Sequence, residues 1–500
     1  MAKISSELSE SLREYLILTG WITTKPEKVS LETKLGEHIT LQYPYMTARM
    51  QCVVGPEMAV AAGRNGILTC IPRSLRDEDK QKILDANKEA RLKAEDIEFV
   101  ENPHCADPND KLEDVISLIN KTGHSVIPIL DRKSKLYGVY VHNPDNPPSV
   151  PPKTPVSLVM TTLSCAHTDD KEQLRAILNS EKRRFIPIVD ENGILQRIAF
   201  KQKYDTNFTG IAISTRPGWE AELERWGPQV DTLMIDSSNA CFEDAKNIIK
   251  EAKKRFPDKP FGIGNIIQGR DFIDFAEAGA DYIIGGMGVG SICQTGSTRG
   301  NGRGQFTVAK ECAEARDVYY NKVGRYVQLV VDGGIANVKD MTVALAFGDL
   351  IMMGNYFNRF YEAAARKLDA NKEPTSEEAL IRFIETWGEG HPRARLVAMF
   401  GMDFENVLKN PKPEELSRVI ERYGHASIST ATVEGVVGAV SYRGRLKPCV
   451  EDDARYIRTT ISNVGAANLS EFREKAVLEK ASVETIRDMY PHDIVELKKN

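Results

Sequence analysis

Eight short apolar runs, separated by amphipathic stretches, constrain the fold of this 500-residue chain more than any other feature. From residue 209 onward the runs recur every 20 to 45 residues or so, a spacing that predicts βα units in a parallel sheet. Eight such strands fit a (β/α)₈ TIM barrel. A doubly wound open sheet would have a similar pattern, but tandem glycine-rich loops late in the chain favour the barrel. The expected strands are 43–47, 66–70, 209–213, 232–235, 261–264, 282–285, 327–331 and 350–353, with helices such as 242–255, 270–278 and 307–321 between them.

The regular spacing breaks between residues 102 and 205, where the chain contains an internal repeat. The segments KLEDVISLINKTGHSVIPILDRKSKLYGVYV and KEQLRAILNSEKRRFIPIVDENGILQRIAF each read as a helix, a strand, a turn with an aspartate and a second strand. We therefore expect an inserted α+β domain at 102–205, with the barrel formed by 1–101 and 206–500. The halves resemble a tandem cystathionine-β-synthase (CBS) type domain pair, which implies a regulatory adenine or guanine nucleotide; a purely structural insertion is the alternative.

The loop GVGSICQTGSTRGNGRGQ, residues 288–305, places Cys293 after the apolar run that ends near residue 285. Glycines allow the backbone to approach a ligand closely and to adopt positive φ. Because parallel α/β folds place their chemistry at the C-terminal ends of strands, the thiol is a candidate nucleophile. A glycine-rich turn with a bystander cysteine is the alternative.

Two further glycine motifs predict a nucleotide-binding site. In VDGGI, the Asp332 carboxylate follows a strand and can accept both hydroxyls of a ribose, while Gly333 and Gly334 offer unobstructed N–H groups to phosphate. The segment Gly354-Asn355-Tyr356 repeats this arrangement one strand later, where barrels often bind phosphate. Ser291 can add a hydroxyl donor to the same phosphate.

Composition narrows the remaining classes of function. The chain is 41% hydrophobic and 27% charged with a net charge of −5, which gives no reason to expect nucleic acid as a partner. No apolar stretch has the length of a membrane span, and the polar N-terminus is not a targeting peptide. The eight cysteines follow no metal-binding or C-x-x-C spacing, which predicts free thiols in a reducing cytoplasm.

Several motifs in fixed order resemble one family. GSICQTGSTRGNGRGQ, VDGGI, MMGNYFNRF, GIGNI and the early segment PYMTARMQCVVGPEMAVAAGRNGI are similar to those of inosine 5′-monophosphate (IMP) dehydrogenase, and GMP reductase, its close relative, shares much of the set. The resemblance runs nearly end to end. It implies NAD-dependent oxidation of IMP to xanthosine 5′-monophosphate through a covalent thioimidate on Cys293. It also implies a homotetramer that pairs into octamers.

The resemblance also implies roles for individual residues. It places Met50 under the purine base, for which an ordinary core position is the alternative. It places Glu389 and Gly390, in TWGEGHPRAR, near the edge of the base. The nicotinamide end of NAD faces Asp236, Ser237 and Ser238, with Asn265 beside it; a helix N-cap is the alternative for the first three. The resemblance assigns the activation of water to the Arg422-Tyr423 pair on a flap, for which a surface helix end is the alternative, and to a relay of Thr295 and Glu434. Potassium is held by the carbonyl groups of Gly288, Gly290 and Cys293.

The chain departs from the family in two places. About twenty extra residues precede Arg422, and the C-terminal segment SVETIRDMYPHDI replaces the Glu-Gly-Gly that completes the potassium site from a neighbouring subunit. Three functions therefore stay open: an IMP dehydrogenase, an NADPH-dependent GMP reductase that releases ammonia, and a non-catalytic nucleotide sensor. The Arg-Tyr pair favours the dehydrogenase, because the reductase needs no water activation.

Overall fold

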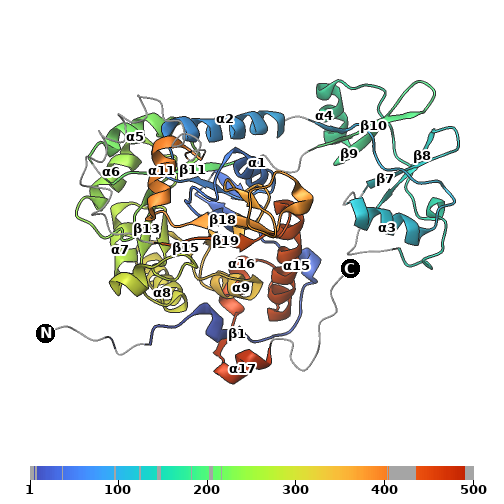
Figure 1. The fold of residues 1–500 in the computed structure, drawn as a ribbon. Helices are drawn as coiled ribbons and strands as arrows, with labels where there is room; N and C mark the ends of the chain where they lie inside the picture. Colours follow the sequence, from blue (N-terminus) through green and yellow to red (C-terminus); the bar gives the residue numbers. More distant parts are fainter. Residues whose placement is uncertain are drawn as a thin grey trace. The chain divides into compact units, whose positions relative to one another are not determined.

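The computed structural model describes residues 5, 8–36, 38–94, 97–122, 126–142, 148–181, 183–201, 207–215, 217–402, 404 and 435–489. The chain divides into two compact units (Figure 1). The first, the barrel unit, comprises residues 1–88 and 206–500, and the second, the inserted unit, comprises residues 89–205. The first boundary lies earlier than the expected residue 102, because strand β6 (Glu98–Val100) pairs with β10 (Leu195–Phe200) inside the inserted unit.

Eight parallel strands form the centre of the barrel unit, and each lies at a position where the sequence predicts one. Their order around the sheet is β4-β16-β15-β14-β13-β12-β11-β5. A parallel bridge between Met46 and Leu68 connects the two end strands, with Thr47 N–H donating to Leu68 O at 3.0 Å. The sheet therefore closes into a (β/α)₈ barrel and is not an open sheet. The strands are β4 (Tyr45–Thr47), β5 (Thr69–Ile71), β11 (Thr209–Ile213), β12 (Thr232–Asp236), β13 (Phe261–Ile266), β14 (Tyr282–Gly285), β15 (Gln328–Asp332) and β16 (Leu350–Met353).

Amphipathic helices surround these strands (Figure 1). In α6 (Ala245–Arg255) the buried residues Ala245, Ile248, Ile249 and Ala252 recur at helical spacing. Three basic residues in its last turn interact favourably with the negative, C-terminal end of the helix dipole. The helices outside the inserted repeat also include α1 (Pro56–Arg64), α2 (Asp77–Ala94), α5 (Trp219–Trp226), α7 (Gly269–Ala278), α8 (Gln305–Val323), α9 (Val338–Leu345), α10 (Asn355–Asn358), α11 (Pro392–Phe400), α15 (Leu446–Val464), α16 (Leu469–Lys475) and α17 (Val483–Asp488).

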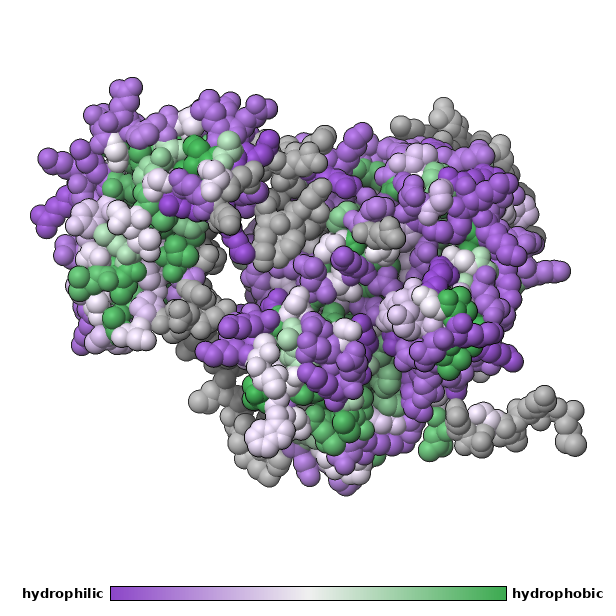
Figure 2. All heavy atoms as spheres, turned by 180° about the vertical axis from the view of Figure 1, so that it is seen from behind, coloured by the Kyte–Doolittle hydropathy of each residue, from purple (hydrophilic) through white to green (hydrophobic). Residues whose placement is uncertain are grey.

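The surface mixes polar and apolar side chains. Figure 2 shows hydrophobic patches on both units, separated by polar residues. In the barrel unit, Trp21 is 91% exposed and Ile22 is 64% exposed. Among the described residues, no helix combines the length and the apolar character that crossing a membrane requires.

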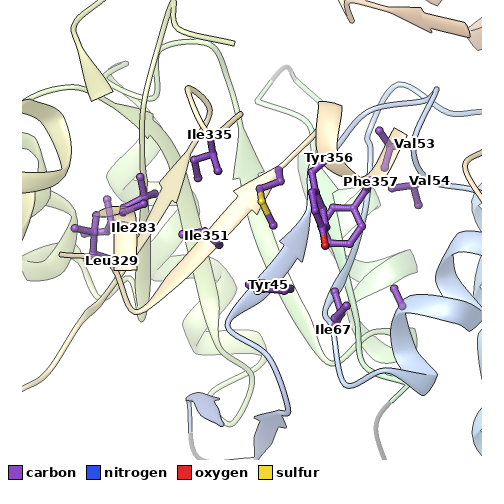
Figure 3. Packing of buried hydrophobic residues seen from close by; sticks show 14 of the residues in the cluster. Tyr45, Val53, Val54, Ile67, Ile283, Leu329, Ile335, Ile351, Tyr356 and Phe357 are labelled. Atoms are coloured by element: carbon purple, nitrogen blue, oxygen red, sulfur yellow. The ribbon is translucent and has the colours of Figure 1, made fainter. Parts of the chain in front are cut away.

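The barrel strands bury side chains on both faces, as expected of a parallel sheet. Along β15, Leu329 and Val331 pack outward against the helices, whereas Val330 joins the cluster inside the barrel. Figure 3 shows part of the outer layer, where Tyr45 and Ile351 lie near Tyr356 of α10. The rings of Tyr45 and Tyr356 are 6.4 Å apart in an edge-on arrangement.

All eight cysteines are free, and three of them, Cys52, Cys70 and Cys312, are buried. Burial raises the pKa of the Cys70 thiol to about 12, so this group behaves as a small apolar side chain rather than as a nucleophile.

The two ends of the barrel differ. At the N-terminal end, the hairpin of β2 (Thr33–Leu35) and β3 (Ile39–Leu41) packs Leu35, Ile39 and Leu41 into the inner cluster. At the C-terminal end, segments after β16 form an antiparallel sheet of β17 (Lys367–Leu368), β18 (Phe383–Trp387) and β19 (Val437–Ser441). A strand pair, β1 (Tyr15–Ile17) with β20 (Leu478–Lys480), joins the N-terminal and C-terminal parts of the unit. Since the first end is plugged, space for a ligand is left at the second.

The inserted unit consists of two copies of one motif, as the repeat predicts. The first copy is α3 (Leu112–Thr122), β7 (Val126–Leu130) and β8 (Leu136–Val141), and the second is α4 (Lys171–Ser180), β9 (Phe185–Val189) and β10. Asp131 and Asp190 occupy equivalent turns, in which the carboxylate accepts the N–H groups two and four residues ahead.

The two copies meet through their hairpin tips. Leu136 N–H donates to Gly193 O at 3.0 Å, and Leu195 N–H donates to Ser134 O at 3.3 Å. This reciprocal exchange relates the copies by an approximate two-fold axis.

Candidate functional site

A cavity of about 1410 Å³ lies at the C-terminal ends of the barrel strands. Its volume exceeds the 300–1,000 Å³ or so of an ordinary small-molecule site, and it is large enough for a mononucleotide beside part of a dinucleotide. Most of the residues singled out in the sequence line it: Met50, Asp236, Ser237, Ser238, Asn265, Gly288, Gly290, Ser291, Cys293, Thr295, Asp332, Gly333, Gly334, Gly354, Asn355, Glu389 and Gly390.

The loop that carries Cys293 begins where β14 ends and is held close to the strands. Gly286 has φ +144°, and a Cβ there would lie 2.0 Å from the carbonyl oxygen of Asp332, so only glycine fits. An antiparallel bridge between Met287 and Arg303 closes the base of the loop. The exposed thiol of Cys293 donates to the Thr295 hydroxyl at 3.3 Å. The loop therefore presents a thiol and a hydroxyl side by side to the cavity.

Asp332 ends β15 with its carboxylate at the cavity wall. One oxygen, Oδ2, accepts Nδ2 of Asn265 at 2.9 Å and Nη2 of Arg49 at 3.2 Å. Within the described part of the chain, no group donates to Oδ1, so this oxygen is available to a ligand. Burial raises the pKa of Asp332, and Arg49 and Asn265 oppose that rise. The next two residues, Gly333 and Gly334, have φ of +85° and +72°, a conformation that favours glycine.

Arg49 is a site residue that the sequence analysis missed. It follows β4 and is only 7% exposed, yet its side chain lines the cavity. Nη1 lies 3.3 Å from Oδ1 of Asp236, and Nη2 donates to Oδ1 of Asn265 at 2.7 Å. Burial lowers its pKa, but the carboxylates of Asp236 and Asp332 outweigh that effect and the guanidinium stays charged. A lone arginine inside the apolar run YPYMTARMQCVV was the available signal.

Glu389 follows β18 and reaches the cavity from the antiparallel sheet. Its Oε1 accepts Gln51 N–H at 2.7 Å, and its Oε2 accepts the hydroxyl of Ser74, a second lining residue that sequence reasoning missed. Burial raises the pKa of Glu389 to about 7, although both hydrogen bonds oppose the rise. A carboxyl group that titrates near neutrality is suited to proton transfer.

The remaining predicted residues fall into three groups. Met50 packs against Gly354, where a Cβ would lie 2.6 Å from the methionine sulfur. Tyr356 does not line the cavity; it is buried, and its hydroxyl donates to Oδ2 of Asp453 at 2.8 Å. Arg422, Tyr423 and Glu434 lie outside the described residues.

The helix-cap alternative for Asp236, Ser237 and Ser238 does not hold for α6. That helix begins at Ala245, with Asp244 at the N-cap position. Instead, Ser237 N–H donates to Gly264 O at 2.9 Å and Asn265 N–H donates to Ser237 O at 2.7 Å. These bonds tie the ends of β12 and β13 together beside the cavity, which Asp236, Ser237 and Ser238 line.

The predicted potassium ligands lie together in the loop that lines the cavity, and the potassium site stays a prediction. Of the carbonyl groups of Gly288, Gly290 and Cys293, that of Gly290 already accepts Cys293 N–H at 3.0 Å. No cluster of three or more acidic, histidine or cysteine side chains suited to a metal occurs in the described ranges.

Comparison with known proteins gives a consistent result. The family model described as "IMP dehydrogenase / GMP reductase domain" matches residues 10–492. The inosine-5′-monophosphate dehydrogenase of Tritrichomonas foetus is 30% identical over 99% of this chain and 98% of its own length, and that of Aquifex aeolicus is 24% identical over the same shares. Among solved structures, a GMP reductase variant from Trypanosoma brucei in complex with guanosine 5′-monophosphate matches with a TM-score of 0.65 at 20% identity, over 98% of this chain and 99% of that one.

Proposed function

The chain belongs to the IMP dehydrogenase / GMP reductase family, and we propose that it oxidises IMP to xanthosine 5′-monophosphate with NAD⁺ as the hydride acceptor. The observation that carries this proposal is the position of the Cys293 thiol, which shares one cavity with the Asp332 carboxylate and the glycine pairs suited to phosphate. The curated relatives over the full length of the chain are named as the dehydrogenase.

The mononucleotide is held by groups at the ends of β14, β15 and β16. Oδ1 of Asp332 accepts ribose hydroxyls, and the backbone N–H groups of Gly333, Gly334 and Gly354 with the Ser291 hydroxyl bind the phosphate. Met50 then lies beneath the purine. This placement brings C2 of the base toward Cys293.

The first half-reaction forms a bond between the Cys293 sulfur and C2. The thiolate attacks, and the hydrogen on C2 leaves with its electron pair, so the purine is oxidised and held as a thioimidate. NAD⁺, when bound, supplies the acceptor for this hydride. On the protein, Asp236, Ser237, Ser238 and Asn265 would hold the nicotinamide riboside at the ends of β12 and β13. The Thr295 hydroxyl, 3.3 Å from the sulfur, can donate a hydrogen bond to the thiolate.

The second half-reaction hydrolyses the thioimidate. Water adds to C2, the carbon–sulfur bond breaks, and the thiol is restored as xanthosine 5′-monophosphate leaves. We assign the activation of water to Arg422 and Tyr423, with Thr295 and Glu434 as a second proton relay. Family resemblance supports these roles, and the position of Thr295 beside the thiol supports the relay.

GMP reductase is the second candidate, because the solved structures with this fold include GMP reductases. That reaction consumes NADPH and releases ammonia. Absorbance at 340 nm separates the two functions: IMP with NAD⁺ should raise it, and GMP with NADPH should leave it unchanged. A fall with GMP and NADPH alone would establish the reductase. If no purine nucleotide reacts although one binds, the chain is a non-catalytic sensor.

We further propose that the inserted unit is a CBS-type pair that binds an adenine or guanine nucleotide. Its two equivalent motifs, related through the hairpin tips at Ser134 and Gly193, support this proposal. Titration calorimetry of the whole protein with ATP and GTP, with IMP present to fill the barrel, tests it. If no heat remains, the insertion is purely structural.

An assembly of four copies, or of eight, is the expected state in solution. The exposed Trp21 and Ile22 support burial of this region between copies. Light scattering after gel filtration measures the mass directly, and a monomeric mass would refute the proposal.

A further inference from the structure

Arg49 connects the ends of three barrel strands. Its guanidinium reaches Asp236 at the end of β12, Asn265 in β13 and Asp332 at the end of β15, at 3.3, 2.7 and 3.2 Å. Asn265 completes a closed set, because its Nδ2 donates to the same Asp332 oxygen that Arg49 contacts and to Gly286 O. A buried cation with two carboxylates and an amide is costly to desolvate, so its presence in a cavity wall calls for a function.

Arg49 contacts only one of the two carboxylate oxygens of Asp332, Oδ2. Both Arg49 and Asn265 donate to Oδ2, and within the described residues Oδ1 has no donor. The carboxylate is therefore fixed in rotation with one oxygen turned from the protein. On the other side, Nη1 of Arg49 faces Asp236, the carboxylate that we assign to the dinucleotide.

We propose that Arg49 is a positioning residue that fixes Asp332 in its ionised, ribose-accepting orientation and couples it to Asp236. The inference rests on the proposed function, since it takes Asp332 as the carboxylate that binds the ribose of IMP. An ionised carboxylate oxygen that has no other donor is a strong acceptor for a ribose hydroxyl, and this arrangement supplies one. Arg49 itself touches no reacting atom.

The charged and titratable groups around Asp332 define the expected pH dependence. Among the described residues, Arg49, Asp236 and Cys70 act on Asp332 directly, and Tyr282 acts on Arg49. Burial raises the pKa of Cys70 to about 12 and moves that of Tyr282 above its ordinary value, so neither titrates between pH 6 and 8. Without Arg49, the pKa of Asp332 rises further, because burial and Asp236 both raise it. The protonated carboxyl then binds ribose poorly, and affinity falls as the pH falls.

The test is calorimetric titration of the full-length protein with IMP at pH 6 and pH 8. We expect Arg49→Gln to weaken IMP binding by roughly 10-fold or more, with the larger loss at pH 6. The double variant Arg49→Gln/Asp236→Asn should recover part of the loss at pH 6, because it removes the charge that raises the pKa of Asp332. Glu389 titrates in the same range, so variant and wild type are compared at each pH.

Arg316→Gln is the matched control. Arg316 is also buried and lies 3.3 Å from a buried aspartate, Asp349, but it does not line the cavity. The substitution Arg316→Gln should lower the unfolding temperature and leave the affinity for IMP unchanged at both pH values.

Equal IMP affinity in Arg49→Gln and wild type, or a loss that is the same at both pH values and not relieved in the double variant, would overturn the inference. If wild type binds IMP but does not reduce NAD⁺, the proposed function fails while the role of Arg49 is still decided by binding. If the protein reduces NAD⁺ with IMP and Arg49→Gln binds normally, only the inference fails.

Discussion

Replacing Glu389 by glutamine should make the barrel unit more stable at high pH. Burial raises the pKa of Glu389 from 4.5 to about 7 in the folded protein, so the folded state favours the protonated carboxyl. In the unfolded chain the group ionises near its ordinary value. Wild-type stability therefore falls as the pH rises from about 4.5 to about 7, because the unfolded state releases the proton first. Glutamine has no such titration.

The size of the effect follows from the shift. A shift from 4.5 to about 7 corresponds to about 3 kcal/mol between pH 4.5 and pH 8. The amide can still accept Gln51 N–H through its oxygen, so the hydrogen bond at 2.7 Å is retained. We expect Glu389→Gln to have nearly wild-type stability at pH 5 and to be up to about 3 kcal/mol more stable at pH 8.

Urea unfolding followed by tryptophan fluorescence is the appropriate assay. Every tryptophan of the chain lies in the barrel unit, so the fluorescence reports the unfolding of that unit and not of the inserted unit. These residues are Trp21, Trp219, Trp226 and Trp387. Glu378→Gln is the control, because the hydrogen bond from Arg445 lowers the pKa of Glu378 and its titration falls below pH 5. A stability difference between Glu389→Gln and wild type that is constant from pH 5 to 8 would refute the reasoning.

Four further predictions concern the chemistry and the loop. Cys293→Ser should abolish turnover while calorimetry still detects IMP binding, because the thiol that reacts and the Asp332 carboxylate that binds the ribose are separate groups. Asp332→Ala should weaken IMP binding by roughly 2–5 kcal/mol in the same titration, and an unchanged affinity would place the ribose elsewhere. Arg422→Ala should give a burst of NADH equal to the number of active sites in stopped flow, followed by turnover about 10²–10⁴-fold slower; normal steady turnover would make the match to the Arg-Tyr pair accidental. Gly286→Ala should lower the unfolding temperature and the affinity for IMP, because its Cβ would meet the Asp332 carbonyl, whereas Gly438→Ala, whose Cβ would meet no atom of the described residues within 4 Å, should change neither.

The barrel could be predicted from the sequence because its signals are local. Each strand is a short apolar run, and the structure places a strand within a few residues of every predicted position. The N-terminal limit of the inserted unit depends instead on the pairing of β6 with β10, two segments about a hundred residues apart, and no local pattern encodes that pairing. The small sheet of β17, β18 and β19 was missed for the same reason.

In the candidate site, too, the residues in local motifs could be predicted and those that depend on long-range contacts could not. Cys293, Asp332 and the glycine pairs lie in compact motifs, and the structure brings them to one cavity. Arg49 is a single charge in an apolar run, and its partners come from strands about 190 to 280 residues away. Tyr356 belongs to a predicted phosphate motif, but its hydroxyl is bonded to Asp453 of α15, a contact that the motif does not encode.

The central claim is that Cys293 forms a covalent bond to the purine of IMP during oxidation by NAD⁺. Peptide mass spectrometry of protein quenched with acid during turnover tests it most directly. We predict a purine nucleotide adduct on the peptide that contains Cys293, formed with IMP and NAD⁺ together and absent from Cys293→Ser. An adduct on another cysteine, no adduct while NADH accumulates, or an adduct formed only with GMP and NADPH would contradict the account.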